Sequence, residues 1–529
     1  MTVARTFAAS ALLLLATSCA STLRFADKPV VWQVDDQRDI AEPEPRDFVV
    51  AAYAAGIFAF TPLDRGLSVP SKSQAWNTNS FDEVPNSSWF QNRIGRYPIT
   101  PARAARGSDE SGPPLPPLTV TSGKTGGGNV GFVAKDATGR RFLIKFDSPD
   151  NPELQTASSV IVNRFFWSIG YNVPVDHVMT LQPRELALAP DAHFENAVGD
   201  QHPFDAKALD ALMTEVPHNA DGSFRITSSQ WVTGKPKGGF PMTGVRPDDA
   251  NDVIPHQHRR ELRGLRVFAA WLDHTDIKED NTLDVWEEER GKHFLRHYLL
   301  DFGEALGGHA AEKHRREDGF EHFWDWEAQP RALLSFGLWR RPWEGRVPAP
   351  FAAVGSLPAD DFDPRLWREA YPYVPFAEMD PADAYWAAKI VMRFDRELID
   401  ALIATGRLSE PRAARYLGRA LAIRRTKIGK AYLTPLTDLD DFHVEGNQLC
   451  ATALSSRYGL YYGGVLESLN AAGRVHYSTA IDNDGHVCLP PQPAGYRVLS
   501  LRIRRDNTTT PPMQVHLTDH TRVIGIVRI

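Results

Sequence analysis

Two stretches in the middle of the chain decide the fold: His274-Thr275-Asp276-Ile277-Lys278-Glu279-Asp280-Asn281 and Asp301-Phe302-Gly303. Apolar residues at helical spacing over residues 259–273 predict a helix that leads into the first stretch. Two apolar runs, 282–286 and 294–300, flank a polar turn and predict a hairpin that brings Asp301 beside Asn281. The sequence therefore predicts that carboxylate, amide and amino groups gather where the helix and the hairpin end.

The order and spacing of these residues resemble the protein-kinase-like superfamily, in which an H-R-D-x-x-x-x-N loop is followed by D-F-G. The resemblance implies that Asp276 orients the attacking hydroxyl and that Lys278 offsets the charge of the transferred phosphoryl group. It also implies that Asn281 and Asp301 supply oxygen ligands to Mg²⁺. An alternative stays open for the loop alone, in which its Asp and Asn residues only cap turns.

Residues 118–181 predict a small β-rich lobe that precedes this loop. The run Gly126, Gly127 and Gly128 lies between its first two strands, where glycine lets backbone amides approach phosphates closely. Lys145 ends the third strand, and the resemblance implies that it pairs with the α- and β-phosphates of ATP. The glycine run alone fits a flexible hairpin tip equally well.

A helix follows this strand, beginning at Pro152 and ending at Gly170. Glu153 lies in its first turn and is the expected partner of Lys145, because kinases position that lysine with a glutamate. The spacing between the two residues is short for this role. Glu153 also suits the positive end of the helix dipole, which is the alternative reason for a glutamate there.

The rest of the chain predicts a helical region and then a β-rich one. Residues 182–430 form an insertion and a helical lobe, with one long helix from Asp380-Pro381 to Gly406. Residues 431–529 carry alternating strands and turn signals, and predict a β-sandwich. Cys450 and Cys488 are the expected disulfide pair of this region, and two unpaired buried thiols are the alternative.

Residues 118–430 thus resemble the atypical HipA-like and CotH-like branches of the superfamily. The expected fold class is α+β, with a two-lobed protein-kinase-like fold followed by the C-terminal β-sandwich. The resemblance implies that ATP and Mg²⁺ bind in the cleft between the lobes.

The N-terminus predicts export. Arg5 precedes an apolar run over residues 7–16 that is too short to remain as a membrane span, and Ala16-Thr17-Ser18-Cys19 resembles a lipoprotein cleavage motif. The resemblance implies that residues 1–19 form the signal peptide and that lipid on Cys19 anchors the chain to a membrane. Residues 20–117 are then a tether and extension, and the expected place is the periplasmic face of the outer membrane. A simple signal peptide is the alternative.

Charge composition and the expected export limit the partners and the activities that this chain can have. The chain carries 59 basic and 66 acidic side chains, a net charge of −7, and no basic tail or stripe, so we expect no nucleic-acid partner. Export favours an envelope protein or polymer as partner, yet exported compartments hold little ATP. Three hypotheses follow: an atypical kinase, a catalytically inactive kinase-like scaffold, and a hydrolase that binds metal through four residues, His274, Asp276, His297 and Asp301.

Overall fold

The computed structural model describes residues 24–26, 29–60, 73–123, 130–195, 200–309, 312–313, 315–345 and 347–528. The chain divides into two compact units. The larger unit comprises residues 35–76 and 86–428, and the smaller unit comprises the chain before residue 35, residues 77–85 and the chain from Gly429 onward. The stretch expected to be one extension, residues 20–117, is therefore shared between both units.

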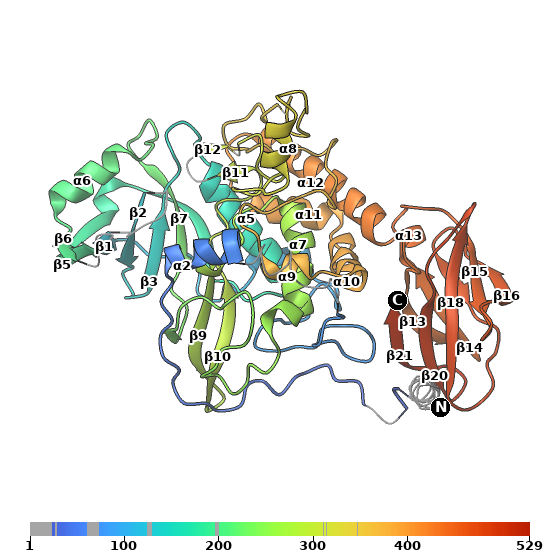
Figure 1. The fold of residues 1–529 in the computed structure, drawn as a ribbon. Helices are drawn as coiled ribbons and strands as arrows, with labels where there is room; N and C mark the ends of the chain where they lie inside the picture. Colours follow the sequence, from blue (N-terminus) through green and yellow to red (C-terminus); the bar gives the residue numbers. More distant parts are fainter. Residues whose placement is uncertain are drawn as a thin grey trace, which may run out of the picture. The chain divides into compact units, whose positions relative to one another are not determined.

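A seven-stranded sheet forms one part of the larger unit, in the order β4-β7-β3-β2-β1-β5-β6 (Figure 1). Its strands are β1 (Leu118–Gly123), β2 (Gly131–Lys135), β3 (Arg141–Lys145), β4 (Asp176–Leu181), β5 (Leu186–Glu195), β6 (Gln201–Pro203) and β7 (Phe224–Gln230). β1 and β5 run parallel, and the other neighbours are antiparallel. The sheet therefore continues beyond residue 181, because three of its strands come from the expected insertion.

Alternating side chains give this sheet its apolar core. Phe142 and Ile144 of β3 are buried, as are Phe132 and Ala134 of β2. Helix α6 (Ala206–Thr214) packs apolar side chains against the same cluster. Lys145 follows Ile144 directly and is only partly buried, because neighbouring residues of a strand point to opposite faces.

Helix α5 (Leu154–Ile169) follows β3, with almost every residue buried. Asp147 caps its start: one carboxylate oxygen accepts hydrogen bonds from the backbone amides of Gln155 and Thr156, both at 2.9 Å. Gly170 ends it with φ 146°, in a place where a β-carbon would lie 2.3 Å from the Phe90 ring. The expected end of this helix at Gly170 is confirmed, whereas the helix begins at Leu154, two residues after the expected start at Pro152.

The helical part of the larger unit contains α7 (Arg260–Leu272), α9 (Val374–Ala377), α10 (Pro381–Met392) and α11 (Arg396–Ala404). It also contains α12 (Pro411–Tyr432) up to Ile428, and the last turn of α12 belongs to the smaller unit. Helix α7 packs on α10, and the buried Asp383 of α10 pairs with Arg260 at 2.9 Å and with Arg263 at 3.4 Å. The single long helix expected from Asp380 to Gly406 is wrong. The chain breaks after Met392, and the Asp395 side chain caps α11 by accepting from the Leu398 amide at 2.8 Å.

Shorter elements complete the larger unit. A three-stranded sheet is built from β8 (Lys235–Pro236), β9 (Thr282–Glu289) and β10 (Lys292–Leu299), and β11 (Gly308–His309) pairs with β12 (Glu312–Lys313). The remaining elements are α2 (Val50–Ala55), η1 (Gly56–Phe60), α4 (Pro101–Arg106), η2 (Pro183–Glu185), η3 (His256–His258), η4 (Glu279–Asn281) and α8 (Ala328–Leu334). β9 and β10 confirm the expected hairpin.

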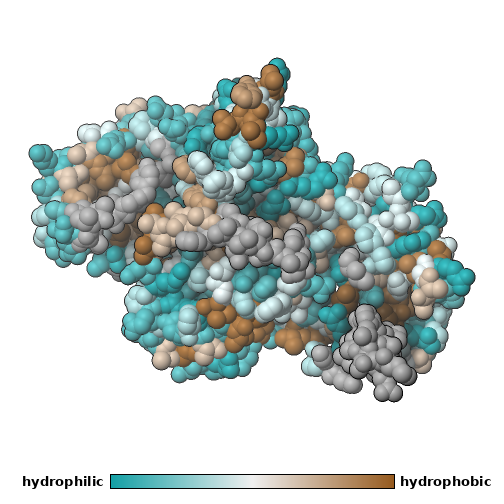
Figure 2. Space-filling view, viewed as in Figure 1, coloured by the Kyte–Doolittle hydropathy of each residue, from teal (hydrophilic) through white to brown (hydrophobic). Residues whose placement is uncertain are grey.

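An apolar patch projects from the larger unit around α8, where brown side chains gather at the top of Figure 2. Leu333 and Leu334 end the helix and are 78% and 75% exposed, and Phe336 and Leu338 beyond it are 93% and 88% exposed. These side chains lie outside the core of the unit.

The smaller unit is β-rich and contains two sheets around one apolar core. The three-stranded sheet has the order β13-β14-β17, from Leu439–Glu445, Gln448–Ala453 and His486–Cys488. The other sheet has the order β16-β15-β18-β20-β21, with β19 beside β18. Its strands are β15 (Val465–Leu469), β16 (Val475–Ala480), β18 (Arg497–Arg505), β19 (Thr508–Thr509), β20 (Met513–Thr518) and β21 (Arg522–Arg528), and a short helix, α13 (Leu454–Arg457), follows β14.

The expected disulfide between Cys450 and Cys488 is formed. It joins two residues that face each other across β14 and β17. No helix in the described part of the chain is both long enough and apolar enough to span a bilayer.

Candidate functional site

The loop after α7 is held from both sides. Asp273 ends the helix with φ 52°, and its carboxylate accepts a hydrogen bond from the Trp367 ring at 3.0 Å and pairs with Arg424 at 3.2 Å. His274 Nδ1 lies 3.0 Å from the carbonyl oxygen of Glu304, which can only accept, so Nδ1 carries the proton. The His274 contact fixes the start of the loop against the segment that follows Asp301, and the Asp273 bonds fix it against Trp367 and Arg424.

Asp276 and Asn281 form the centre of the loop, and both are buried. The Asn281 side-chain amide donates to the Asp276 carboxylate at 2.7 Å and to the Asp276 carbonyl at 2.8 Å. Lys278 Nζ lies 2.9 Å from the other carboxylate oxygen of Asp276. Burial acts to lower the pKa of Lys278, but the Asp276 carboxylate outweighs burial and the pKa is raised. Lys278 therefore stays charged at neutral pH.

Asp301 joins this loop through the backbone. The amide of Leu300 donates to the carbonyl of Asn281 at 2.9 Å, so the end of β10 lies beside the loop as expected. Asp301 itself has φ 56°, a left-handed conformation that a residue other than glycine adopts at an energetic cost. Its carboxylate is 39% exposed and lies 2.7 Å from Lys145 Nζ.

Lys145 thus reaches the loop from the seven-stranded sheet. Its backbone is held between Gly131 of β2 and Thr227 of β7, which keeps it at the end of β3. The buried Asp176 of β4 also interacts electrostatically with Lys145. The structure therefore brings Lys145 to Asp301, and Asp301 to the loop that holds Asp276 and Asn281.

Asp280 adds a further carboxyl group that the sequence analysis did not single out. Burial raises its pKa, Lys278 lowers it, and the negative charges of Asp276 and Asp301 raise it again. These influences locate Asp280 among the other charged side chains. Its position within residues 274–281 was the only sign in the sequence that Asp280 belongs to the site. An acidic residue by itself is no such sign, because acidic residues are common in loops.

Glu153 does not take its expected role. It precedes α5 with φ 69°, and its carboxylate accepts a hydrogen bond from the backbone amide of Ser409 at 2.9 Å. Among the ion pairs of the described residues, Lys145 pairs with Asp301 and no pair joins it to Glu153. The prediction is wrong because Asp147 caps the helix, which leaves Glu153 in a turn directed at another segment.

Two further expectations lie outside the described residues: the glycine run Gly126, Gly127 and Gly128, and the lipidation site Cys19. The glycine run connects β1 to β2, which pair as neighbouring antiparallel strands.

The metal site expected for a hydrolase is not assembled. His297 Nδ1 lies 2.6 Å from Asp284, and its ring stacks on Trp89 with 3.5 Å between centroids. Across the parts of the chain that the structure describes, His274, Asp276, His297 and Asp301 do not form a group with metal-ligand spacing. His297 is therefore a buried structural histidine.

Comparisons with known proteins add little to this geometry. No family model matches the chain, and no curated protein matches it. A crystal structure of the Golgi casein kinase with Mn and ADP bound is similar at 11% identity and a TM-score of 0.31, over 60% of this chain and 72% of that chain. Another crystal structure of the Golgi casein kinase is similar at 9% identity and a TM-score of 0.29, over 75% and 96%. Likenesses this low assign no function to this chain.

Proposed function

We propose that the larger unit is an ATP- and magnesium-dependent phosphotransferase of the protein-kinase-like class. The observation that carries the proposal is the 2.7 Å contact of Lys145 with Asp301, next to the hydrogen-bonded pair of Asp276 and Asn281. A basic side chain, two carboxylates and an amide, supplied by segments far apart in the sequence, are the groups that phosphoryl transfer requires.

The charges of the site fit a divalent cation. Burial raises the pKa of Asp280 most, and the negative charges of Asp276 and Asp301 raise it further against the opposing charge of Lys278. Lys278 pairs with Asp276, and Lys145 pairs with Asp301. A cation held by carboxylate and amide oxygens would relieve this repulsion, and Mg²⁺ prefers such ligands. Asp301 and Asn281 are the proposed ligands of this cation. The carboxylate of Asp301 is partly exposed, so a cation can reach it from solvent.

Each of the other residues has a role in the proposal. ATP would supply the phosphoryl group, and magnesium would neutralise the charge that develops on it. Asp276 would orient the acceptor hydroxyl and accept its proton. Lys278, held charged by Asp276, would lie beside the negative charge of the reacting group. Lys145 would bind the phosphates from the side of the sheet.

We further propose that the chain acts in the bacterial envelope, anchored by lipid on Cys19 at the periplasmic face of the outer membrane. The acceptor would then be an envelope protein, sugar or polymer. Intact-mass measurement tests the anchor, because Cys19→Ser should remove the mass of the acyl chains, whereas an unlipidated wild-type chain would contradict it.

Nucleotide binding tests the phosphotransferase directly. The purified full chain, in detergent, is titrated with ATP in the presence and absence of Mg²⁺ while its thermal unfolding is followed. We expect Mg²⁺ and ATP together to raise the melting temperature. Asp301→Asn should remove the magnesium dependence, because the amide keeps the shape but not the charge of the ligand, and Lys145→Met should weaken binding about tenfold or more.

Lys207→Met is the matched control, because Lys207 is exposed on α6, away from the site. It should bind ATP as the wild type does. A melting temperature that does not move at millimolar ATP and Mg²⁺ would sink the proposal and leave the kinase-like scaffold as the remaining function. The scaffold would bind its envelope partner unchanged in both Asp301→Asn and Lys145→Met.

A further inference from the structure

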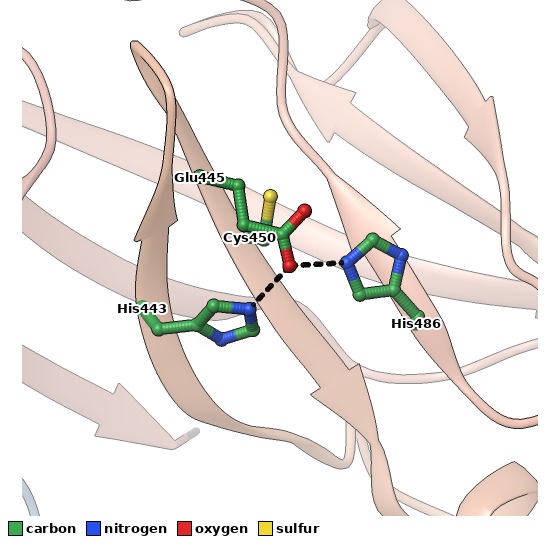
Figure 3. A group of neighbouring side chains, drawn as sticks. All are labelled: His443, Glu445, Cys450 and His486. Atoms are coloured by element: carbon green, nitrogen blue, oxygen red, sulfur yellow. Dashed lines mark hydrogen bonds and ion pairs between the residues drawn. The ribbon is translucent and has the colours of Figure 1, made fainter.

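A second group of side chains with metal-binding chemistry lies in the smaller unit, on the three-stranded sheet (Figure 3). His443 and Glu445 come from β13, Cys450 from β14 and His486 from β17. One ligand atom from each lies within 4.8 Å of the others. In the described part of the chain, this is the only group of histidine, cysteine and carboxylate side chains with such spacing.

Strand register explains how the group assembles. His443 faces Cys450 across the first strand pair, and Cys450 faces Cys488 across the second. Glu445 lies two residues from His443, and His486 lies two residues from Cys488, so all of them share one face of the sheet. The other face carries Leu449, Ala451 and Val487 into the apolar core. The group therefore lies on the face away from the core.

The distances fit the coordination sphere of a single ion. Glu445 Oε1 lies 2.8 Å from His443 Nε2 and 3.1 Å from His486 Nε2. Zinc lies about 2.0–2.2 Å from imidazole nitrogen and carboxylate oxygen, so its ligands are separated by roughly 3.3 Å in a tetrahedron. Small rotations of exposed side chains would open the present spacing to that value.

The rings are also turned correctly. His443 Nδ1 lies 2.8 Å from the carbonyl oxygen of Asp441, which only accepts, so Nδ1 donates and Nε2 is the nitrogen available to a ligand. His486 Nδ1 lies 3.9 Å from the Asp482 carboxylate, on the side away from Glu445. A metal-bound histidine is usually oriented by a carbonyl or carboxylate hydrogen-bonded to its other nitrogen, as His443 is. The Asp482 carboxylate is too far from His486 Nδ1 for a hydrogen bond and interacts with that ring only as a charge.

The disulfide limits the ligand set. Cys450 is bonded to Cys488, so neither sulfur is a thiolate, and the ligands that remain are two imidazoles and one carboxylate. Three protein ligands leave the fourth position of a tetrahedral ion to water or to a group from outside. The disulfide also fixes β17 against β14, which keeps His486 Nε2 within 3.1 Å of Glu445 on the far side of β14.

We propose that His443, Glu445 and His486 bind one divalent late transition-metal ion, of the zinc class, with the disulfide intact. Imidazole ligands select such ions over Mg²⁺ and Ca²⁺, which prefer oxygen. The site belongs to the smaller unit and is independent of the proposed phosphotransferase chemistry of the larger one.

Competition against a chromophoric chelator tests the proposal, with the tag-free full chain and Zn²⁺ near neutral pH and no reductant. We expect one zinc ion per chain, not displaced by excess Mg²⁺. His443→Ala, His486→Ala and Glu445→Gln should each weaken zinc binding at least about tenfold.

His476→Ala is the matched control, because His476 is exposed on β16 of the same unit and outside the group. It should bind zinc as the wild type does. Thermal unfolding without metal checks that every variant is folded. We expect each of them to fold, because none of the substituted side chains is buried. Equal affinity in His443→Ala and His476→Ala, or no stoichiometric zinc in the wild type, would overturn the site and show only a hydrogen-bonded His–Glu–His group.

Discussion

The two polar sites of this protein are built in opposite manners. The site of the larger unit joins segments far apart in the sequence, from β3, from the loop after α7 and from the end of β10, and Asp276 and Asn281 are buried in it. The group in the smaller unit joins neighbouring strands of one small sheet, and two of its side chains, His443 and Glu445, are exposed. The first was visible in the sequence and the second was not, because a loop motif is local whereas strand register is not.

The largest expected effect tests whether the two sites are independent. Asp276→Asn should lower Mg²⁺-dependent phosphate release from ATP about 10²–10⁴-fold, because an amide cannot accept the proton of the attacking group. Zinc binding at His443 should not change. Phosphate release is followed with labelled ATP, with the exposed Asp361→Asn as control. A wild-type rate in Asp276→Asn would contradict the assigned role, and a loss of zinc in it would contradict the independence.

The next effect contrasts buried and exposed charge within the larger unit. Asp383→Ala leaves the buried Arg260 and Arg263 without their shared carboxylate and should lower the free energy of unfolding by about 3–5 kcal/mol. Asp400→Ala breaks the exposed pair with Arg396 and should cost less than about 1 kcal/mol.

Denaturant unfolding followed by tryptophan fluorescence measures this difference. Every tryptophan except Trp32 lies in the larger unit, so the signal reports that unit. Equal losses of unfolding free energy in Asp383→Ala and Asp400→Ala would contradict the prediction. They would show that the buried pairs of Asp383 with Arg260 and Arg263 stabilise the fold no more than an exposed pair does.

The smallest effect concerns pH and the surroundings of Lys145. Burial raises the pKa of Asp176 to about 6, against the opposing effects of Ser229, Arg164 and Lys145. The unfolded chain releases this proton near pH 3.8, whereas the folded chain keeps it until about pH 6. Stability contributed by this group therefore falls as pH rises from about 4 to 6, by roughly 2–3 kcal/mol in total.

Asp176→Asn should remove that dependence. The difference in unfolding free energy between Asp176→Asn and the wild type should move in favour of the variant from pH 4 to pH 7, as measured by denaturant titrations at each pH. Asp210→Asn, an exposed change on α6, should show no such trend. A flat difference for Asp176→Asn would mean that its carboxyl group is hydrated in the folded protein.

What the sequence could predict depended on how local each signal was. The end of α5 at Gly170, the β9–β10 hairpin and the Cys450–Cys488 bond followed from a glycine stop, turns and cysteine number, and the structure confirms them. The mixed α and β character and the β-rich end of the chain were also expected, and both are observed.

The remaining predictions were wrong or missing because they depended on contacts between residues that are far apart in the sequence. Nothing in residues 182–230 indicated that β5 and β7 would join the first sheet beside β1 and β3. Glu153 looked like a partner of Lys145 by position, but the cap at Asp147 turned it toward Ser409. The group of His443, Glu445 and His486 required the register of three strands, which no spacing in the sequence encodes.

The bond between Cys450 and Cys488 also closes a covalent ring, and that ring contains more than the two strands it joins. β15 and β16 lie between the two cysteines, yet they belong to the other sheet. A protease that cut the exposed turn between β15 and β16 would therefore release no fragment, because both pieces would stay joined through sulfur. Non-reducing gels should show an intact chain after such a nick, and reducing gels should show two.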